Sequence, residues 1–176
     1  MNKEEILQWA NRYDVEFPKW TKTERELGSK LRKTKELTKE DLLEIVRWKF
    51  NGQMWLNKRL KSASTNDDEK VRRISKDVFN STDDFFRMDN LQRLNGVGGA
   101  VASTILTFYN PKHYGVFDRH VWREFFGAFP KNVYLWTTDN YLKKLLPKLT
   151  EIAKQHSLDV RTVEKAHFTK RILNKR

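Results

Sequence analysis

The chain has 176 residues, of which 38% are hydrophobic and 33% charged, and its 35 Lys and Arg residues outnumber its 23 Asp and Glu residues to give a net charge of +12. This composition supplies a core for one compact domain over residues 1–176 and argues against disorder throughout, and no apolar run approaches the roughly 20 residues that a membrane span needs. Because the chain contains no Cys, disulfides, thiolate catalysis and cysteine-bound zinc or iron–sulfur clusters are excluded as well.

Amphipathic helical patterns follow one another along the first half of the chain. "NKEEILQWANRY" and "LTKEDLLEIVRWKF" each place apolar residues on one face, and the second opens with Thr38 and Asp41 in the spacing of a capping box. A polar loop then leads to a helix that buries Val71 and its neighbours and begins at Asn66 or Asp67. Alternating strand patterns of useful length are absent, so the sequence predicts an all-α fold.

The second half of the chain continues in the same way. The segments "AVASTILTFY", "RHVWREFF" and the basic "VRTVEKAHFTKRIL" are each predicted to be helical. Between them lies the long pattern "NYLKKLLPKLTEIAKQHS", which Pro147 is expected to kink or divide because proline lacks a backbone N–H donor.

The positive charge indicates a polyanionic partner. Residues 131–176 hold 11 basic and 4 acidic side chains, so the C-terminal part carries the strongest field. Nucleic acid is the partner most typical of such a charge. A lysine-rich surface that only aids solubility is the alternative, and charge alone leaves it open.

A glycine-rich turn separates two of the predicted helices. Three of the seven glycines stand at Gly96, Gly98 and Gly99, in "LNGVGGAVASTIL", and the next helix is expected to begin near Gly99. Free backbone N–H groups at such a helix start can hold a phosphate, which would position a duplex without reading its sequence. An ordinary glycine turn between two helices is the alternative.

Asp118, in "YGVFDRHVW", follows the hairpin at a defined spacing of eighteen residues after Ala100. Together the two elements resemble the helix-hairpin-helix DNA glycosylases, whose hairpin pattern L-x-G-[VI]-G is followed by an aspartate at this distance. The run of Asp118, His120 and Trp122 is similar to the 8-oxoguanine DNA glycosylase branch, and "RTVEKAHF" resembles the closing helix of that superfamily. The resemblance covers about residues 91–125, with weaker support beyond, whereas the first ninety residues match only in being helical.

The resemblance implies helices in two lobes that flank a DNA-binding groove, and removal of a damaged or modified base from double-stranded DNA. Asp118 would be the catalytic carboxylate, stabilising the oxocarbenium-like sugar and activating water. An N-cap role for Asp118 is compatible with this chemistry. The residues implied in DNA binding are Asn95, Gly96, Val97, Gly98, Gly99, Ala100, Arg119 and His120.

Because the chain has no Cys and only four scattered His residues, we expect a protein that needs no cofactor and no metal, without the cluster found in some branches of the family. We expect a monomer in the cytoplasm, associated with the nucleoid if the source is bacterial or archaeal. A DNA-binding module without catalytic activity, which keeps only the hairpin and the basic surface, is the alternative function. The sequence does not identify the base.

Ala100 departs from the family pattern, because many members carry lysine at this hairpin position and use its amine to attack the sugar and nick the strand. Alanine cannot do so, and the resemblance therefore implies a monofunctional glycosylase without lyase activity. The exception would be another lysine that enters the site, for which Lys49 is the candidate.

The segment "WKFNGQMW" offers candidates for the base pocket or for a wedge that fills the space of an extruded base: Trp48, Lys49, Asn51 and Gln53. Core packing of the aromatic residues and a plain polar turn are the alternative interpretations of this segment.

Overall fold

A computed structural model describes residues 1–128 and 134–174, and within these ranges the chain is helical without strands, as the sequence predicts. The elements follow in order as α1 (Lys3–Glu16), α2 (Pro18–Thr34), α3 (Lys39–Phe50), α4 (Leu56–Ser64), α5 (Asp68–Asn80), α6 (Asp84–Leu91), α7 (Gly99–Tyr109), α8 (Arg119–Phe126), α9 (Thr138–Asn140), the π-helical turn η1 (Tyr141–Leu145), α10 (Leu146–His156) and α11 (Val160–Leu173). In the described residues, no helix combines the length and apolar character that crossing a membrane requires.

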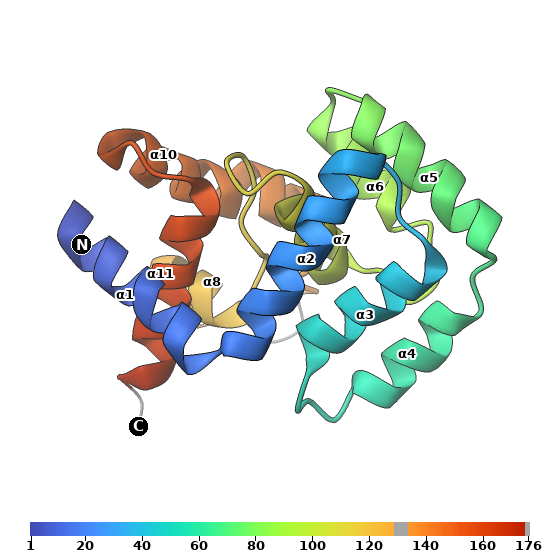
Figure 1. Ribbon diagram of the computed structural model, residues 1–176. Helices are drawn as coiled ribbons and strands as arrows, with labels where there is room; N and C mark the ends of the chain where they lie inside the picture. Colours follow the sequence, from blue (N-terminus) through green and yellow to red (C-terminus); the bar gives the residue numbers. More distant parts are fainter. Residues whose placement is uncertain (129–133, 175–176) are drawn as a thin grey trace.

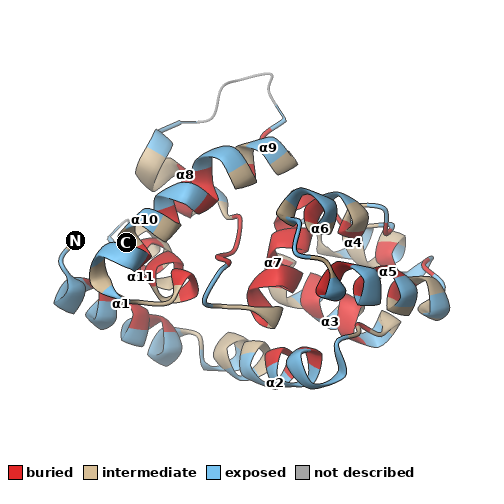
Figure 2. Cartoon of the chain, turned by 90° about the horizontal axis from the view of Figure 1, so that it is seen from above, coloured by how far each residue is buried: buried red, intermediate tan, exposed pale blue. Residues whose placement is uncertain are grey.

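The helices gather in two groups (Figures 1 and 2). One group contains α1, α8, α10 and α11, so that the N-terminal helix packs along the C-terminal one. The other contains α3 to α7, and α2 runs between the groups and packs on α7. The chain therefore crosses from one group to the other and returns, which brings residues from both ends close to its middle.

Helix α7 lies at the centre of the fold, and Figure 2 shows it buried along most of its length. Its sequence, "GAVASTILTFY", has no charged residue, as expected for a helix surrounded by protein. Its buried hydroxyls are satisfied locally: Ser103 donates to the Ala100 carbonyl and accepts from the Phe117 backbone N–H at 2.9 Å. This last bond ties the segment before Asp118 to α7.

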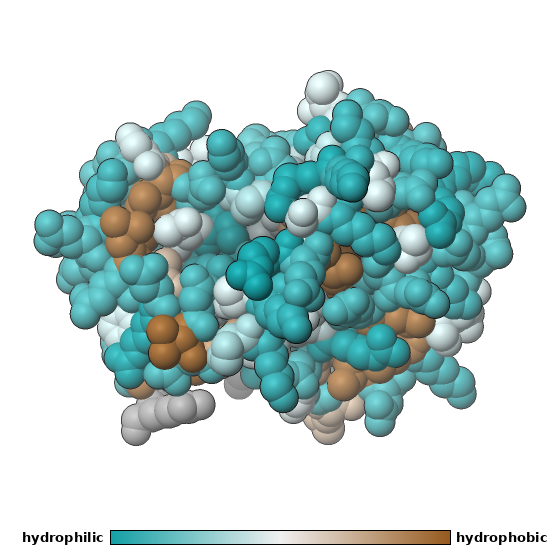
Figure 3. Space-filling view, in the orientation of Figure 1, coloured by the Kyte–Doolittle hydropathy of each residue, from teal (hydrophilic) through white to brown (hydrophobic). Residues whose placement is uncertain are grey.

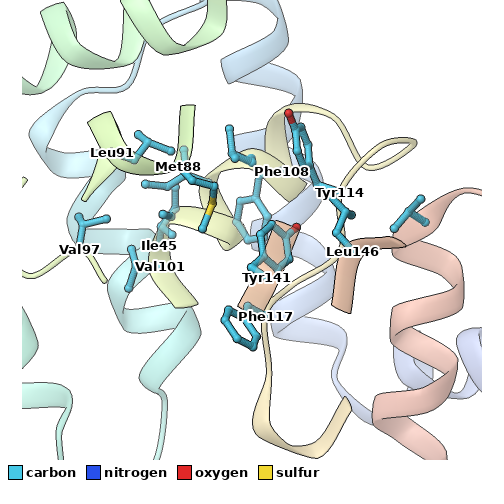
Figure 4. Packing of buried hydrophobic residues seen from close by; sticks show 14 of the residues in the cluster. Ile45, Met88, Leu91, Val97, Val101, Phe108, Tyr114, Phe117, Tyr141 and Leu146 are labelled. Atoms are coloured by element: carbon cyan, nitrogen blue, oxygen red, sulfur yellow. The ribbon is translucent and has the colours of Figure 1, made fainter. Parts of the chain in front are cut away.

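A continuous cluster of buried hydrophobic side chains joins the two groups. Figure 4 shows part of it, with labelled residues from α3, α6, α7, η1, α10 and the connecting segments: Ile45, Met88, Leu91, Val97, Val101, Phe108, Tyr114, Phe117, Tyr141 and Leu146. The outer face seen in Figure 3 is mainly hydrophilic, with small separate apolar patches, in agreement with the high charged fraction.

The local signals read from the sequence set several helix ends. Thr38 and Asp41 form the predicted capping box of α3. Asp67, the second of the two predicted candidates, caps α5 by accepting from the Lys70 N–H. Pro147 divides the long C-terminal pattern as expected, because it stands in the first turn of α10, directly after the π-helical turn.

A buried histidine makes the fold sensitive to mild acid. His167 is only 8% exposed and packs on Phe125, and burial lowers the pKa of His167 from 6.5 to about 4. The unfolded chain therefore binds this proton near pH 6.5 and the folded chain only near pH 4. Between these values, acid favours unfolding, and we expect the free energy of unfolding to fall by about 2 kcal/mol from pH 7 to pH 5.

Urea unfolding at both pH values measures this loss. His167→Phe should remove most of it, whereas His156→Gln, on α10, should keep it. An unchanged pH dependence in the His167 variant would contradict the assignment.

Candidate functional site

The turn between α6 and α7, residues 92–98, is held from behind by Asn66. The buried Asn66 amide donates to the Asn95 carbonyl and accepts from the Asn95 N–H, both at 2.9 Å. Asn95 also donates from its own amide to Thr65. Asn66, the other residue considered as a cap of α5, thus fixes the glycine turn instead.

Gly96 is the residue in this turn that requires glycine for its backbone conformation. Its φ is +79°, and a Cβ there would lie 2.8 Å from the Ala63 backbone nitrogen at the end of α4. Gly98 is extended, with φ −104°, and Gly99 opens α7 so close to the Trp136 backbone carbonyl that a Cβ would collide with it. The three glycines therefore allow one left-handed turn and two close approaches.

We expect Gly96→Ala to lower the free energy of unfolding by about 2–3 kcal/mol, because left-handed backbone strain adds to the clash with Ala63. Gly52→Ala is the matched control. Gly52 also has a positive φ, +71°, but its Cβ would meet nothing within 4 Å, so only the strain of about 1 kcal/mol should remain. Chemical denaturation measures both variants, and equal losses would contradict the proposed close packing of the turn.

The N-terminus of α7 presents backbone N–H groups beside this turn. Gly98 is the N-cap, and within the described part of the chain no group accepts a hydrogen bond from the N–H of Gly98, Gly99 or Ala100. In contrast, the N–H groups of Asn95 and Val97 are bonded to Asn66 and Leu94. The backbone N–H groups of Gly98, Gly99 and Ala100 could therefore hold an anion. Because the Asn95 backbone N–H is already bonded, Asn95 could contact a partner only through its other atoms.

Asp118 is the N-cap of α8 and uses its two carboxylate oxygens differently. Oδ1 accepts from the His120 backbone N–H at 2.7 Å, which starts the helix. Oδ2 accepts from the Lys49 ammonium at 2.8 Å. The cap predicted from the sequence is confirmed, and the structure adds an ion pair between residues that are far apart in the chain.

The Lys49–Asp118 pair is largely removed from water, with 7% and 14% of the two side chains exposed. Burial by itself would raise the pKa of the Asp118 carboxyl, but the charge and hydrogen bond of Lys49 hold that pKa below its ordinary value. The carboxylate is therefore ionised at neutral pH and keeps its negative charge in a weakly polar environment.

Asp118 and Lys49 line a cavity of about 770 Å³, a volume suited to a small organic ligand. The cavity also contains Gly98, Gly99 and Ala100 from the start of α7. Its aromatic side chains come from both helix groups and from the segment before α9: Tyr13, Trp20, Trp48, Phe50, Trp55, Tyr134, Trp136 and Phe168. The carboxylate thus lies within reach of a ligand that stacks on aromatic rings.

A second buried charge network borders the cavity, which Arg161 and Glu164 line. Arg161, on α11, donates to both carboxylate oxygens of Glu24 at 2.9 and 2.8 Å, and it also pairs with Glu164 and Tyr13. Burial would raise the pKa of the Glu24 carboxyl, but Arg161 holds it below its ordinary value. This network joins Tyr13 on α1 and Glu24 on α2 to Arg161 and Glu164 on α11.

Most of the site residues predicted from the sequence line this cavity. Trp48 is fixed by a bond from its indole N–H to the Trp20 carbonyl at 3.0 Å, and Asn51 and Gln53 stand on the exposed segment after α3. Arg119 and His120 line it as well. The packing interpretation fits Trp48, whose ring meets that of Phe108 edge to face with the ring centres 5.0 Å apart, but it is wrong for Trp55, which is 55% exposed.

Several lining residues were not predicted. Arg161, Glu164 and Phe168 recur at helical spacing on one face of α11, and two charged groups on an otherwise buried face are the signal that could have singled them out. Tyr13 and Trp20 lie on helices whose sequences contain no motif, and only the tertiary structure shows that they face Asp118's cavity.

Comparison with protein-family models, with curated proteins and with solved structures returned no match for this chain.

Proposed function

We propose that the protein is a DNA glycosylase that cleaves the bond between the deoxyribose and a damaged or modified base in double-stranded DNA. The observation that carries this proposal is the ionised Asp118 carboxylate, which lies in an aromatic-lined cavity beside the glycine hairpin. The resemblance of residues 91–125 to helix-hairpin-helix glycosylases supports it from the sequence.

The chemistry requires a negative charge near the sugar. As the base departs, positive charge builds on the deoxyribose ring, and a carboxylate in a poorly solvated site stabilises that charge more than water would. Asp118 meets this requirement, because its carboxylate is ionised and lines the cavity; Oδ1 accepts the α8 capping bond, and Oδ2 accepts from Lys49. In the simplest route, Asp118 also orients the water that captures the sugar.

The cavity suits an extruded base. A base inside a duplex is out of reach of Asp118, so it would have to leave the helical stack at a cost of a few kcal/mol. The aromatic rings of Trp20, Trp48 and Phe168 could compensate for the lost stacking. Trp55 and Met54, 55% and 85% exposed, are apolar side chains that could fill the gap left in the duplex, beside the predicted and likewise exposed Asn51 and Gln53.

The DNA backbone would be held at the rim of the same site. The unbonded N–H groups at the start of α7 suit a phosphate, and Lys58, Arg59 and Arg119 line the cavity with positive charge. In this arrangement the two helix groups lie on either side of the bound nucleotide.

Labelled duplexes that carry oxidised, deaminated, alkylated or bulky modified bases test the proposal. After incubation with the protein, alkali or heat cleaves the strand wherever a base has been removed. We expect cleavage of at least one lesion duplex and none of the unmodified duplex. If duplex binding persists while the entire panel remains uncut, the protein is a DNA-binding module without glycosylase activity.

A further inference from the structure

The role of Asp118 as the N-cap of α8 does not explain its ion pair with Lys49. Lys49 is near the end of α3, and its ammonium reaches Asp118 Oδ2 across the cavity wall, 69 positions further along the chain. The cap of α8 needs only Oδ1. Lys49 therefore has to be accounted for separately.

A permanent ammonium at this place would oppose base removal. Burying a charge pair stabilises a fold little, because the desolvation of both ions offsets their attraction. In addition, a positive charge 2.8 Å from Asp118 weakens the carboxylate's attraction for a developing sugar cation. The arrangement favours the reaction only if Lys49 loses its proton as the base departs.

We infer that Lys49 is the nucleophile that captures the sugar, so that the protein also cleaves the DNA strand as a lyase. This inference rests on the proposed glycosylase function. The side chain at position 100 leaves space for it: Ala100 lines the same cavity and ends at Cβ, and α3 packs directly against α7. The amine is thus supplied by α3 and not by the hairpin.

The steps balance without a further reagent. The electron pair of the bond between C1′ and the base leaves with the base, and the Lys49 ammonium gives the base its proton. The free Nζ then forms a bond to C1′, the resulting ammonium passes a proton to the ring oxygen, and the C1′–O4′ bond breaks to give an iminium ion. Water takes up a C2′ proton, the electron pair of that C–H bond expels the 3′ phosphate and so cuts the strand, and a second water hydrolyses the imine to regenerate Lys49.

The inference can be tested without knowing the base. A duplex with one preformed abasic site is incubated with the full chain and sodium borohydride, which reduces an imine to a stable amine. We expect a covalent protein–DNA complex whose attachment point, mapped by peptide mass spectrometry, is Lys49. Lys49→Arg keeps the charge beside Asp118 but cannot form the imine, and it should lose the complex completely.

Controls separate chemistry from folding and binding. Circular dichroism and affinity for a duplex with a tetrahydrofuran abasic analogue show whether Lys49→Arg folds and binds, and Lys49→Gln serves if it does not. An absent complex with the wild-type chain, an attachment at another amine, or an undiminished complex with the folded variants would each overturn the inference. Base release from the lesion panel is measured separately. If a base is released but no covalent complex is trapped, the glycosylase proposal stands and water is the nucleophile.

Discussion

Asp118→Asn will reduce the rate of base release by about 100-fold or more; it will also lower the free energy of unfolding, because the buried Lys49 loses its charged partner, but the folded variant will still bind the duplex. The asparagine keeps an Oδ1 that can accept from the His120 N–H, and Asn is as good an N-cap as Asp. What is lost is the negative charge on the cavity side, where Lys49 is left without its partner. The loss should therefore appear in the chemical step and not in the formation of the complex.

Single-turnover rates on the lesion duplex that is cleaved best measure this loss, and fluorescence anisotropy measures binding. Asp67→Asn is the matched control, because Asp67 is also an N-cap aspartate, on α5, and its side chain accepts from the Lys70 N–H. It should retain the full rate. Turnover by Asp118→Asn at the wild-type rate would remove Asp118 from the mechanism.

Arg161→Met will lower the free energy of unfolding by about 3–5 kcal/mol. The guanidinium is 95% buried and is bonded to Glu24, Glu164 and Tyr13. Removal of the guanidinium leaves the buried carboxylates of Glu24 and Glu164 without this partner. The free-energy cost of taking their charges out of water is then no longer offset. Because Arg161 and Glu164 line the cavity, the cavity should be disturbed as well.

Urea denaturation at pH 7 measures the change. Arg12→Met is the control, because Arg12 pairs with Glu16 at 3.6 Å on the exposed face of α1, where an ion pair contributes about 1 kcal/mol or less. Adding Glu24→Gln and Glu164→Gln to Arg161→Met should restore part of the stability by removing the orphaned charges. A loss for Arg161→Met no larger than that of the control would mean that the buried network is not what holds α11 against α1 and α2.

The helical fold was predictable because its signals are local. Capping residues such as Thr38 and Asp118, and the proline that divides the C-terminal pattern, act through backbone groups within a few positions of themselves. The glycine turn was located for the same reason, although only one of its three glycines, Gly96, has a positive φ. Gly99 is required by the Trp136 backbone, and a Cβ at Gly98 would meet only the Tyr134 hydroxyl, at 3.3 Å; no local pattern indicates the positions of these neighbours.

The sequence by itself determined that the chain is helical, that Asp118 begins a helix eighteen residues after Ala100, and that the hairpin has no amine at that position. Only the tertiary structure decided which distant groups surround Asp118. Lys49 was a candidate for entering the site, and its 2.8 Å contact exists because α3 packs on α7. Arg161 and Phe168 reach the cavity because α11 folds back along α1. Such contacts depend on how buried helix faces fit together, and a linear pattern of residue types does not contain that information.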